Sequence, residues 1–96
     1  MLTSKERGYL RSLAGTMEPI VLVGKAGVTD SLFKQADEAL TARELIKVRV
    51  LPRSGQERDQ IADQLYVSLG AEVVQRIGNN FVLWRRNPEK PKITLP

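Results

Sequence analysis

The stretch PIVLVGKAGVTDSLF, residues 19–33, constrains the fold more than any other part of this chain. Residues 20–23, Ile-Val-Leu-Val, are apolar at every position and rich in β-branched side chains, which is typical of a strand buried in the middle of a sheet. A loop with the sequence Gly-Lys-Ala-Gly, residues 24–27, follows directly, and Thr29 is then placed to cap a helix. A buried strand that passes through a short loop into a helix predicts an α/β fold.

Two further helices are indicated by capping residues that precede apolar positions at helical spacing. Thr3 and Glu6 have the spacing of a capping box, in which each side chain accepts a hydrogen bond from a backbone N–H of the first turn. Ser54 and Glu57 repeat this spacing, and Gly70 is a suitable residue to end the helix that follows. The predicted helices therefore run over residues 4–14, from Thr29 to about residue 42, and from the Ser54 cap to Gly70.

The segment ELIKVRVL, residues 44–51, alternates between apolar and basic side chains, so a strand here turns Lys47 and Arg49 away from its buried face. Two more strands, over residues 71–77 and 81–86, flank a Gly-Asn-Asn turn and predict an antiparallel hairpin. The expected order is helix, strand, helix, strand, helix, strand, strand. Because strands joined through helices favour parallel pairing, this order predicts a mixed four-stranded sheet with helices packed on it.

A chain of 96 residues supports one hydrophobic core, so we expect one domain over residues 1–86 and a proline-rich tail over 87–96. Three prolines in the tail predict that it packs poorly. Charges interrupt the N-terminal segment where a signal peptide would be apolar, and no apolar run is long enough to cross a bilayer. We therefore expect a cytoplasmic protein without a membrane partner.

The composition argues against catalysis. The chain has no histidine and no cysteine, so it lacks the commonest general acid–base group and the commonest transition-metal ligands. We expect no catalytic residue, no metal site, no cofactor and no small-molecule substrate. The formal charge of +4 instead attracts polyanions such as nucleic acids.

The Gly-Lys-Ala-Gly loop does not match the nucleotide-binding motifs that it superficially resembles. A P-loop needs a glycine where this chain has Pro19 and a serine or threonine where it has Ala26, and a dinucleotide-binding loop needs a third glycine. What remains is G-x-x-G between a strand and a helix, the arrangement through which KH-type modules approach a nucleic-acid backbone. Lys25 would add a charge-assisted donor at the tip, and the alternative is an ordinary tight turn.

Three segments together are more specific than the loop: PIVLVGKAGVTDSL, ALTARELIKVRV and GNNFVLWRRNPEKPKITLP. They resemble the CRM domain, the chloroplast RNA splicing and ribosome maturation family, and in particular its stand-alone bacterial YhbY-like members. The resemblance covers residues 1–86 and implies an α/β fold similar to the C-terminal domain of translation initiation factor three. It also implies that the loop contacts RNA and that the partner is ribosomal RNA of large-subunit precursors. The chain departs from the family in having Glu18 in a connector and Trp84 where tyrosine is usual.

Several side chains outside the loop allow two interpretations each. Arg7 and Arg11 share one flank of the first helix and either contact phosphates or solvate that flank. Trp84 is either a base-stacking platform or a core residue, with the core favoured. Arg85 and Arg86 either contact RNA or screen the tail.

The predicted function is RNA binding, most specifically the binding of ribosomal RNA during assembly of the large subunit. The alternative is a non-enzymatic adaptor that binds proteins on ribosomal particles. The predicted RNA-binding residues are Gly24, Lys25, Ala26, Gly27, Lys47, Arg49, Arg7 and Arg11.

Overall fold

The computed structural model describes residues 2–52 and 57–96. Within these ranges the elements follow the predicted order: α1 (Ser4–Ala14), β1 (Val21–Val23), α2 (Asp30–Arg43), β2 (Leu45–Val50), α3 (Arg58–Leu69), β3 (Glu72–Ile77) and β4 (Asn80–Trp84). The predicted α/β class and the mixed four-stranded sheet are confirmed. β4 ends at Trp84, two residues earlier than the sequence pattern indicated.

The strands are arranged β1-β2-β4-β3 across the sheet. β1 and β2 are parallel, with Val23 opposite Val50, whereas β4 runs antiparallel to both β2 and β3. The hairpin strand β4 therefore lies between β2 and β3. The connection through α3 leads from β2 to β3 and leaves room for β4 between these two strands. β2 and β4 occupy the centre.

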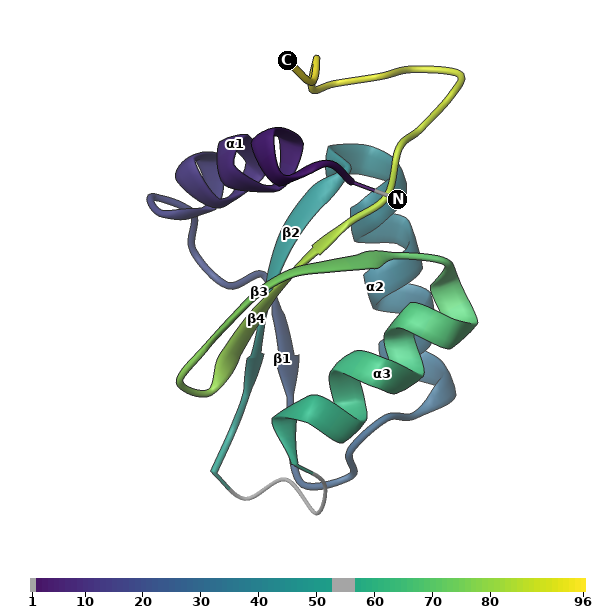
Figure 1. Cartoon of the computed structure of the whole chain (residues 1–96). Coiled ribbons are helices and arrows are strands. Elements are labelled where there is room, and N and C mark those ends of the chain that lie inside the picture. Colours follow the sequence, from purple (N-terminus) through teal and green to yellow (C-terminus); the bar gives the residue numbers. More distant parts are fainter. Residues whose placement is uncertain (1, 53–56) are drawn as a thin grey trace.

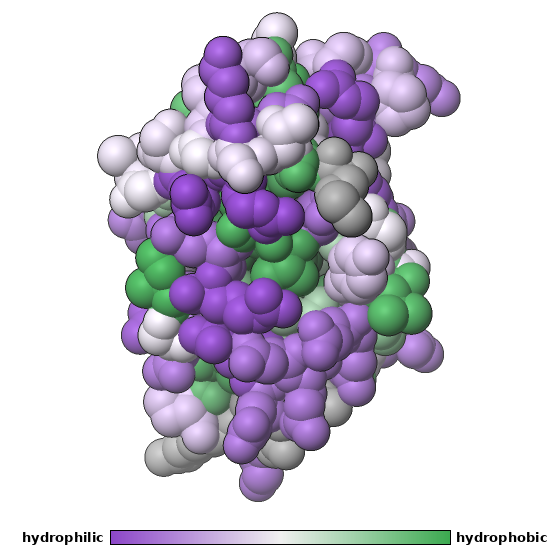
Figure 2. Space-filling model, viewed as in Figure 1, coloured by the Kyte–Doolittle hydropathy of each residue, from purple (hydrophilic) through white to green (hydrophobic). Residues whose placement is uncertain are grey.

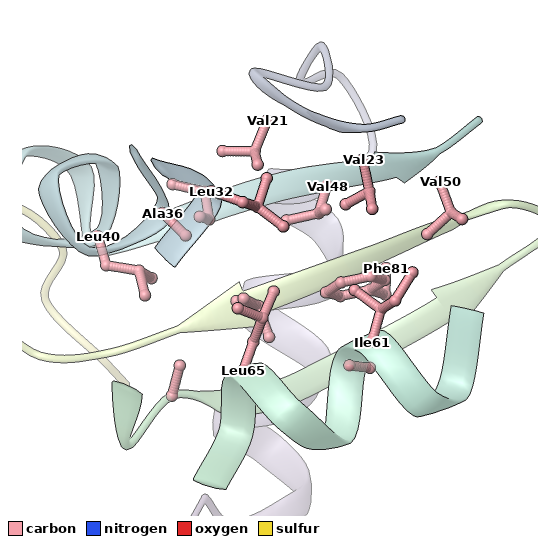
Figure 3. Packing of buried hydrophobic residues seen from close by; sticks show 14 residues of the cluster. Val21, Val23, Leu32, Ala36, Leu40, Val48, Val50, Ile61, Leu65 and Phe81 are labelled. Carbon is pink, nitrogen blue, oxygen red and sulfur yellow. The ribbon is translucent and has the colours of Figure 1, made fainter. Parts of the chain in front are cut away.

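The helices cover both faces of the sheet, which gives three layers (Figure 1). α2 and α3 pack on one face, where their buried residues meet Val48 and Phe81 of the central strands; Figure 3 shows Phe81 beside Ile61 of α3. α1 packs on the other face, where Leu10 meets Trp84 and further apolar residues of the sheet. Alternate residues of the central strands therefore enter two separate hydrophobic clusters.

The helix caps agree with the sequence analysis at two of three helices. Thr3 and Glu6 form the predicted capping box, with distances of 2.9 Å and 3.1 Å between backbone nitrogen and side-chain oxygen. At α2, the Thr29 hydroxyl accepts a hydrogen bond from Leu32 N at 3.1 Å, as predicted. These contacts pair N–H groups that the first helical turn leaves unsatisfied.

The prediction for the third helix is wrong at its start. Glu57 is the cap residue rather than the third helical residue, since its backbone is extended and its N–H donates to Gln60 Oε1 at 3.1 Å. Gln60 thus occupies the position that the sequence pattern gave to Glu57. Ser54, the predicted cap, lies outside the described residues.

The prediction that the tail packs poorly is correct only in part, because most tail residues are exposed but two apolar side chains reach the core. Ile93 and Leu95 contact the apolar cluster beneath α1, and the backbone N–H groups of Lys92 and Ile93 donate to the Glu44 carboxylate. The prolines restrict this segment but leave alternate apolar side chains free to reach the core. In Figure 1 the tail crosses the end of the molecule where α1 lies.

Candidate nucleic-acid interface

The G-x-x-G loop is a closed turn between β1 and α2. Gly27 N donates to Gly24 O at 3.0 Å, which leaves Lys25 and Ala26 exposed at the tip. Gly27 is buried. Its φ of 68° is a backbone conformation that glycine adopts without strain. Gly24 has an ordinary φ, and a Cβ added there would meet no atom within 4 Å.

The two glycines therefore differ in role. Gly27 is buried, whereas Gly24 is half-buried. Gly24 has open space for a ligand backbone, and the next two residues of the turn, Lys25 and Ala26, are exposed.

The loop lies at an edge of the molecule where several chain segments meet. Because β1 and β2 are parallel, both end here, and Leu51 N donates to Val23 O at 2.9 Å. The turn of the β3–β4 hairpin reaches the same edge, since Asn79 O accepts from Val50 N at 2.8 Å. The N-terminal ends of α2 and α3 also lie at this edge, at the bottom of Figure 1, and hydrophilic side chains predominate there in Figure 2.

The electrostatics at this edge are mixed. The N-terminal ends of two helices carry partial positive charge, but each has an aspartate in its first turn, Asp30 in α2 and Asp59 in α3. Lys25 is exposed at the loop tip. Among the residues that the structure describes at this edge, Lys25 and backbone N–H groups are therefore the main groups that can attract an anion.

Two arginines near this edge are engaged by the protein itself. Arg58 contacts Asp59 at 3.0 Å and donates to Gly78 O, and Arg76 contacts Asp59 at 3.2 Å and Asp63 at 3.6 Å. The hydrogen bond from Arg58, together with the charges of both arginines, lowers the pKa of Asp59. Sequence analysis missed this network because its partners come from α3 and from the far strand β3.

Lys47 and Arg49 lie on the sheet face that α1 shares, opposite the large core cluster, as the alternation predicted. Arg49 is exposed, whereas Lys47 is half-buried because it lies closer to the start of β2, where α1 packs on the sheet. In the part of the chain that the structure describes, neither forms an ion pair. Their charges are therefore available to a ligand.

Arg7 and Arg11 do not act as a pair. The Arg7 guanidinium donates to Val73 O at 2.7 Å and lies 3.9 Å from the Glu72 carboxylate, so it attaches α1 to β3. Arg11, one turn later, is exposed. The contacts give Arg7 a structural role that neither sequence interpretation included.

Trp84 is a core residue, with 4% of its surface exposed in the cluster beneath α1. The base-stacking interpretation is wrong because the ring faces the protein, and the Arg86 guanidinium lies 5.9 Å from its centroid. Arg85 is a structural residue as well: its guanidinium donates to Asp37 Oδ1, Leu69 O and Thr41 Oγ1 at 2.8 to 3.0 Å.

Residues 2–52 and 57–96 contain no group of three or more acidic, histidine or cysteine side chains placed to hold a metal ion. None of the helices in these ranges is both long and apolar enough to cross a membrane.

The fold and the loop together define a class: a small three-layer α/β domain with a G-x-x-G turn at the sheet edge. The family model of the CRS1 / YhbY (CRM) domain matches residues 2–85, and the chain belongs to this family.

Similar proteins span the whole chain. It is 45% identical to the Probable RNA-binding protein YqeI of Bacillus subtilis over 100% of both chains. It is 34% identical to a Haemophilus influenzae protein named RNA-binding protein, over 99% of this chain and 95% of the other. The solution structure of SAV1595 from Staphylococcus aureus has a TM-score of 0.81 and 42% identity, covering all of both chains.

Proposed function

We propose that this chain is a non-enzymatic RNA-binding protein whose partner is ribosomal RNA in precursors of the large subunit. The observation that carries the proposal is the exposed tip of the G-x-x-G turn, Lys25 and Ala26, in a chain whose relatives are named RNA-binding proteins. The choice of ribosomal RNA rests on the resemblance to YhbY-like proteins.

The loop would contact the RNA backbone. Gly24 has no side chain and open space around its Cα, so a phosphate can approach the turn closely. Lys25 then donates a charge-assisted hydrogen bond to a phosphate oxygen. Such contacts fix the position of an RNA strand without reading its sequence.

Lys47 and Arg49 would orient the RNA across the sheet, since neither forms an ion pair with a carboxylate in residues 2–52 and 57–96. Of the pair on α1, Arg11 is the residue available for a phosphate, whereas Arg7 holds α1 in place. A protein bound in this way stabilises one conformation of the RNA until later assembly proteins arrive. It would act in the cytoplasm, where subunits are assembled.

Crosslinking the protein to RNA in cells and sequencing the crosslinked sites tests this function. We expect the sites to concentrate in large-subunit ribosomal RNA and in its precursors. Crosslinks spread over all RNAs in proportion to their abundance would contradict the ribosomal assignment.

A second experiment separates RNA binding from the alternative of a protein-binding adaptor. Purification of ribosomal particles with this chain, before and after nuclease treatment, should show its partners released once the RNA is removed. Retention of protein partners after nuclease treatment would favour the adaptor.

A further inference from the structure

Two rows of side chains lie on the sheet face that α1 shares, one beside the hydrophobic cluster beneath α1 and one beyond it. The strand register places Lys47, Val82 and Gln75 side by side in one row. It places Arg49, Asn80 and Ile77 side by side in the next. Successive residues on one face of a strand are about 6.8 Å apart, so the two rows form one continuous surface.

This surface is open to ligands but only partly polar. Ile77 is 59% exposed, and Leu22, beside Arg49 on β1, is 53% exposed. The surface therefore has cations on β2, exposed apolar side chains on the edge strands β1 and β3, and amide side chains on β4 and β3. Such a mixture suits a flat ligand that carries charge on one side and polar groups along an edge.

An unsatisfied acceptor lies in the middle of this surface. Asn80 Oδ1 is buried and, among the described residues, has no hydrogen-bond partner. Buried polar side-chain atoms are satisfied in the large majority of cases, so an orphan acceptor requires an explanation. Asn80 is one of the residues that line a small cavity of about 60 Å³. Lys47, Gln75, Ile77 and Val82 line the same cavity.

The cavity is too small for a nucleobase but large enough for the edge of one. A water molecule occupies about 30 Å³ in the liquid, so the space holds an exocyclic amino group or a hydroxyl with its neighbouring atoms. Asn80 Oδ1 needs a donor, the Gln75 amide can donate and accept, and the Lys47 ammonium donates. Ile77 offers an exposed apolar surface against which a ring can pack.

We propose that the cavity formed by Lys47, Gln75, Ile77 and Asn80 binds one unpaired nucleotide of RNA, with an N–H or O–H donor of that nucleotide hydrogen-bonded to Asn80 Oδ1. The inference rests on the proposed RNA-binding function and adds a site for nucleotide recognition to it. The loop holds the backbone of the RNA, and this cavity reads one nucleotide that is not paired. Arg49, in the same row as Asn80, lies where a flanking phosphate can meet it.

Binding of short single-stranded RNAs tests the site directly. We expect the parent protein to prefer one among oligomers of uridine, cytidine or adenosine by at least about threefold. Asn80→Ala should weaken binding of the preferred oligomer by about three- to tenfold, the loss expected for one hydrogen bond, and reduce the preference. Asn79→Ala is the matched control, because it removes the same side chain from the neighbouring exposed position, and it should bind like the parent.

The donor has two possible sources within the nucleotide, and DNA oligomers distinguish them. If the effect of Asn80→Ala persists on the deoxy form of the preferred oligomer, the donor is on the base; if it disappears, the donor is the ribose 2′-hydroxyl. Both results support the site. An Asn80→Ala protein that binds every oligomer as the parent does overturns it, while leaving the proposed RNA-binding function intact.

A measurement on the parent protein removes any dependence on how the variant folds. Titration with the preferred oligomer should shift the side-chain amide resonances of Asn80 and Gln75 in a ¹⁵N spectrum. If RNA shifts the backbone resonances of residues 24–27 but leaves both side-chain amides unchanged, the nucleotide site is wrong and the loop interaction stands. If neither the oligomers nor ribosomal RNA transcripts bind at all, the proposed function fails together with the site.

Discussion

The Glu44 carboxylate accepts a hydrogen bond from Lys92 N at 2.6 Å, which ties the end of α2 to a residue 48 positions later in the chain. The same carboxylate accepts from Asn87 N at 2.6 Å and from Ile93 N at 2.8 Å. Glu44 is fully buried and has a φ of 65° at the C-cap of α2. One buried side chain therefore satisfies three backbone donors and fixes the path of the tail.

Removal of this carboxylate should destabilise the protein. Glu44→Ala leaves the donors of Asn87, Lys92 and Ile93 without their acceptor, and one unsatisfied buried donor costs about 1 to 3 kcal/mol. Since the freed tail can reach water, we expect a loss of about 2 kcal/mol or more in the free energy of unfolding, measured by urea denaturation. Glu38→Ala, an exposed glutamate on the same helix, is the control and should change stability little. Equal stability of the two variants would mean that the tail is not held by Glu44.

The hydrogen bonds of the Glu44 carboxylate also make the free energy of unfolding depend on pH. Burial raises the pKa of the Glu44 carboxyl, but the N–H donors of Asn87, Ile93 and Lys92 and the charge of Arg86 outweigh burial, so the pKa is lowered from its ordinary value. Because the folded pKa is lowered, the contribution of Glu44 is complete above the unfolded pKa and is lost as pH falls through the folded one.

Urea denaturation at a series of pH values from 7 to 3 therefore should show stability falling below about pH 4.5, the range set by the usual glutamate pKa near 4.3. Glu44→Gln cannot titrate and should be less stable at pH 7 but fall less steeply in acid. A parallel decline in parent and variant would assign the acid sensitivity to other carboxylates, such as Asp59, whose pKa is also lowered by its arginine partners.

The elements of this fold were predictable because their signals are local. The capping contacts of Thr3 and Thr29 join residues only three positions apart in the chain. The alternation around Lys47 likewise involves only the residues of one strand. Glu44 illustrates the opposite case. The pattern places it at the start of a strand, whereas its contacts come from residues more than 40 positions away and depend on how the tail folds back.

The structural role of Arg85 could not be predicted from sequence patterns either, because its partners are distant in the chain. Its guanidinium contacts the Asp37 carboxylate at 2.8 Å and also the backbone oxygens of Asp37 and Leu69, so it joins α2 to the end of α3. Arg85→Lys keeps the charge but loses the planar fork, and we expect a loss of about 1 to 2 kcal/mol in the free energy of unfolding. Arg86→Lys, on the exposed neighbour, should stay within about 0.5 kcal/mol of the parent.

RNA affinity is the second readout for these two variants. Because Arg85 acts on packing rather than on RNA, binding measured well below the melting temperature should remain unchanged in Arg85→Lys. A variant that melts normally yet binds RNA weakly would show instead that Arg85 contacts the ligand.

RNA binding should weaken steeply with salt. Each phosphate neutralised in a single-stranded region contributes about −0.7 to the slope of log K against log salt, so three to five contacts give roughly −2 to −3.5. Lys25→Ala and Lys47→Ala should each make the slope shallower by about 0.7. Lys90→Ala is the control and should leave the slope unchanged, because Lys90 belongs to the C-terminal tail, which lies at the end of the molecule opposite the loop in Figure 1. A flat response of the parent protein to salt would contradict binding through phosphates.

Sequence patterns predicted the candidate residues of this interface, but not the structural differences between them. The G-x-x-G pattern located the turn, because a strand, two glycines and a helix cap are adjacent in sequence. It did not separate Gly24 from Gly27, since the burial of Gly27 depends on how the turn packs. Nor did the spacing of Arg7 and Arg11 show that the first contacts Val73 O of β3.

The difference between Gly24 and Gly27 decides which glycine should be substituted to test the loop. Gly27→Ala places a side chain at a φ of 68°, which costs about 1 to 2 kcal/mol in the left-handed region, so any loss of RNA binding would be mixed with a loss of stability. Gly24→Asp combined with Lys25→Ala avoids this problem, because Gly24 has an ordinary backbone conformation and open space for a side chain.

The double variant Gly24→Asp, Lys25→Ala should bind structured ribosomal RNA at least about tenfold more weakly than the parent. The new carboxylate repels phosphate at short range, where screening is incomplete, and the loss of the ammonium removes a charge-assisted contact worth about 1.5 to 3 kcal/mol. Gly24→Ala alone is the matched control, since it adds a Cβ without charge and should reduce affinity less. Thermal melting by circular dichroism should give all of these proteins the same transition. If the double variant melts like the parent and still binds RNA equally well, residues 24–27 form only a turn, and the RNA contacts lie elsewhere on the domain.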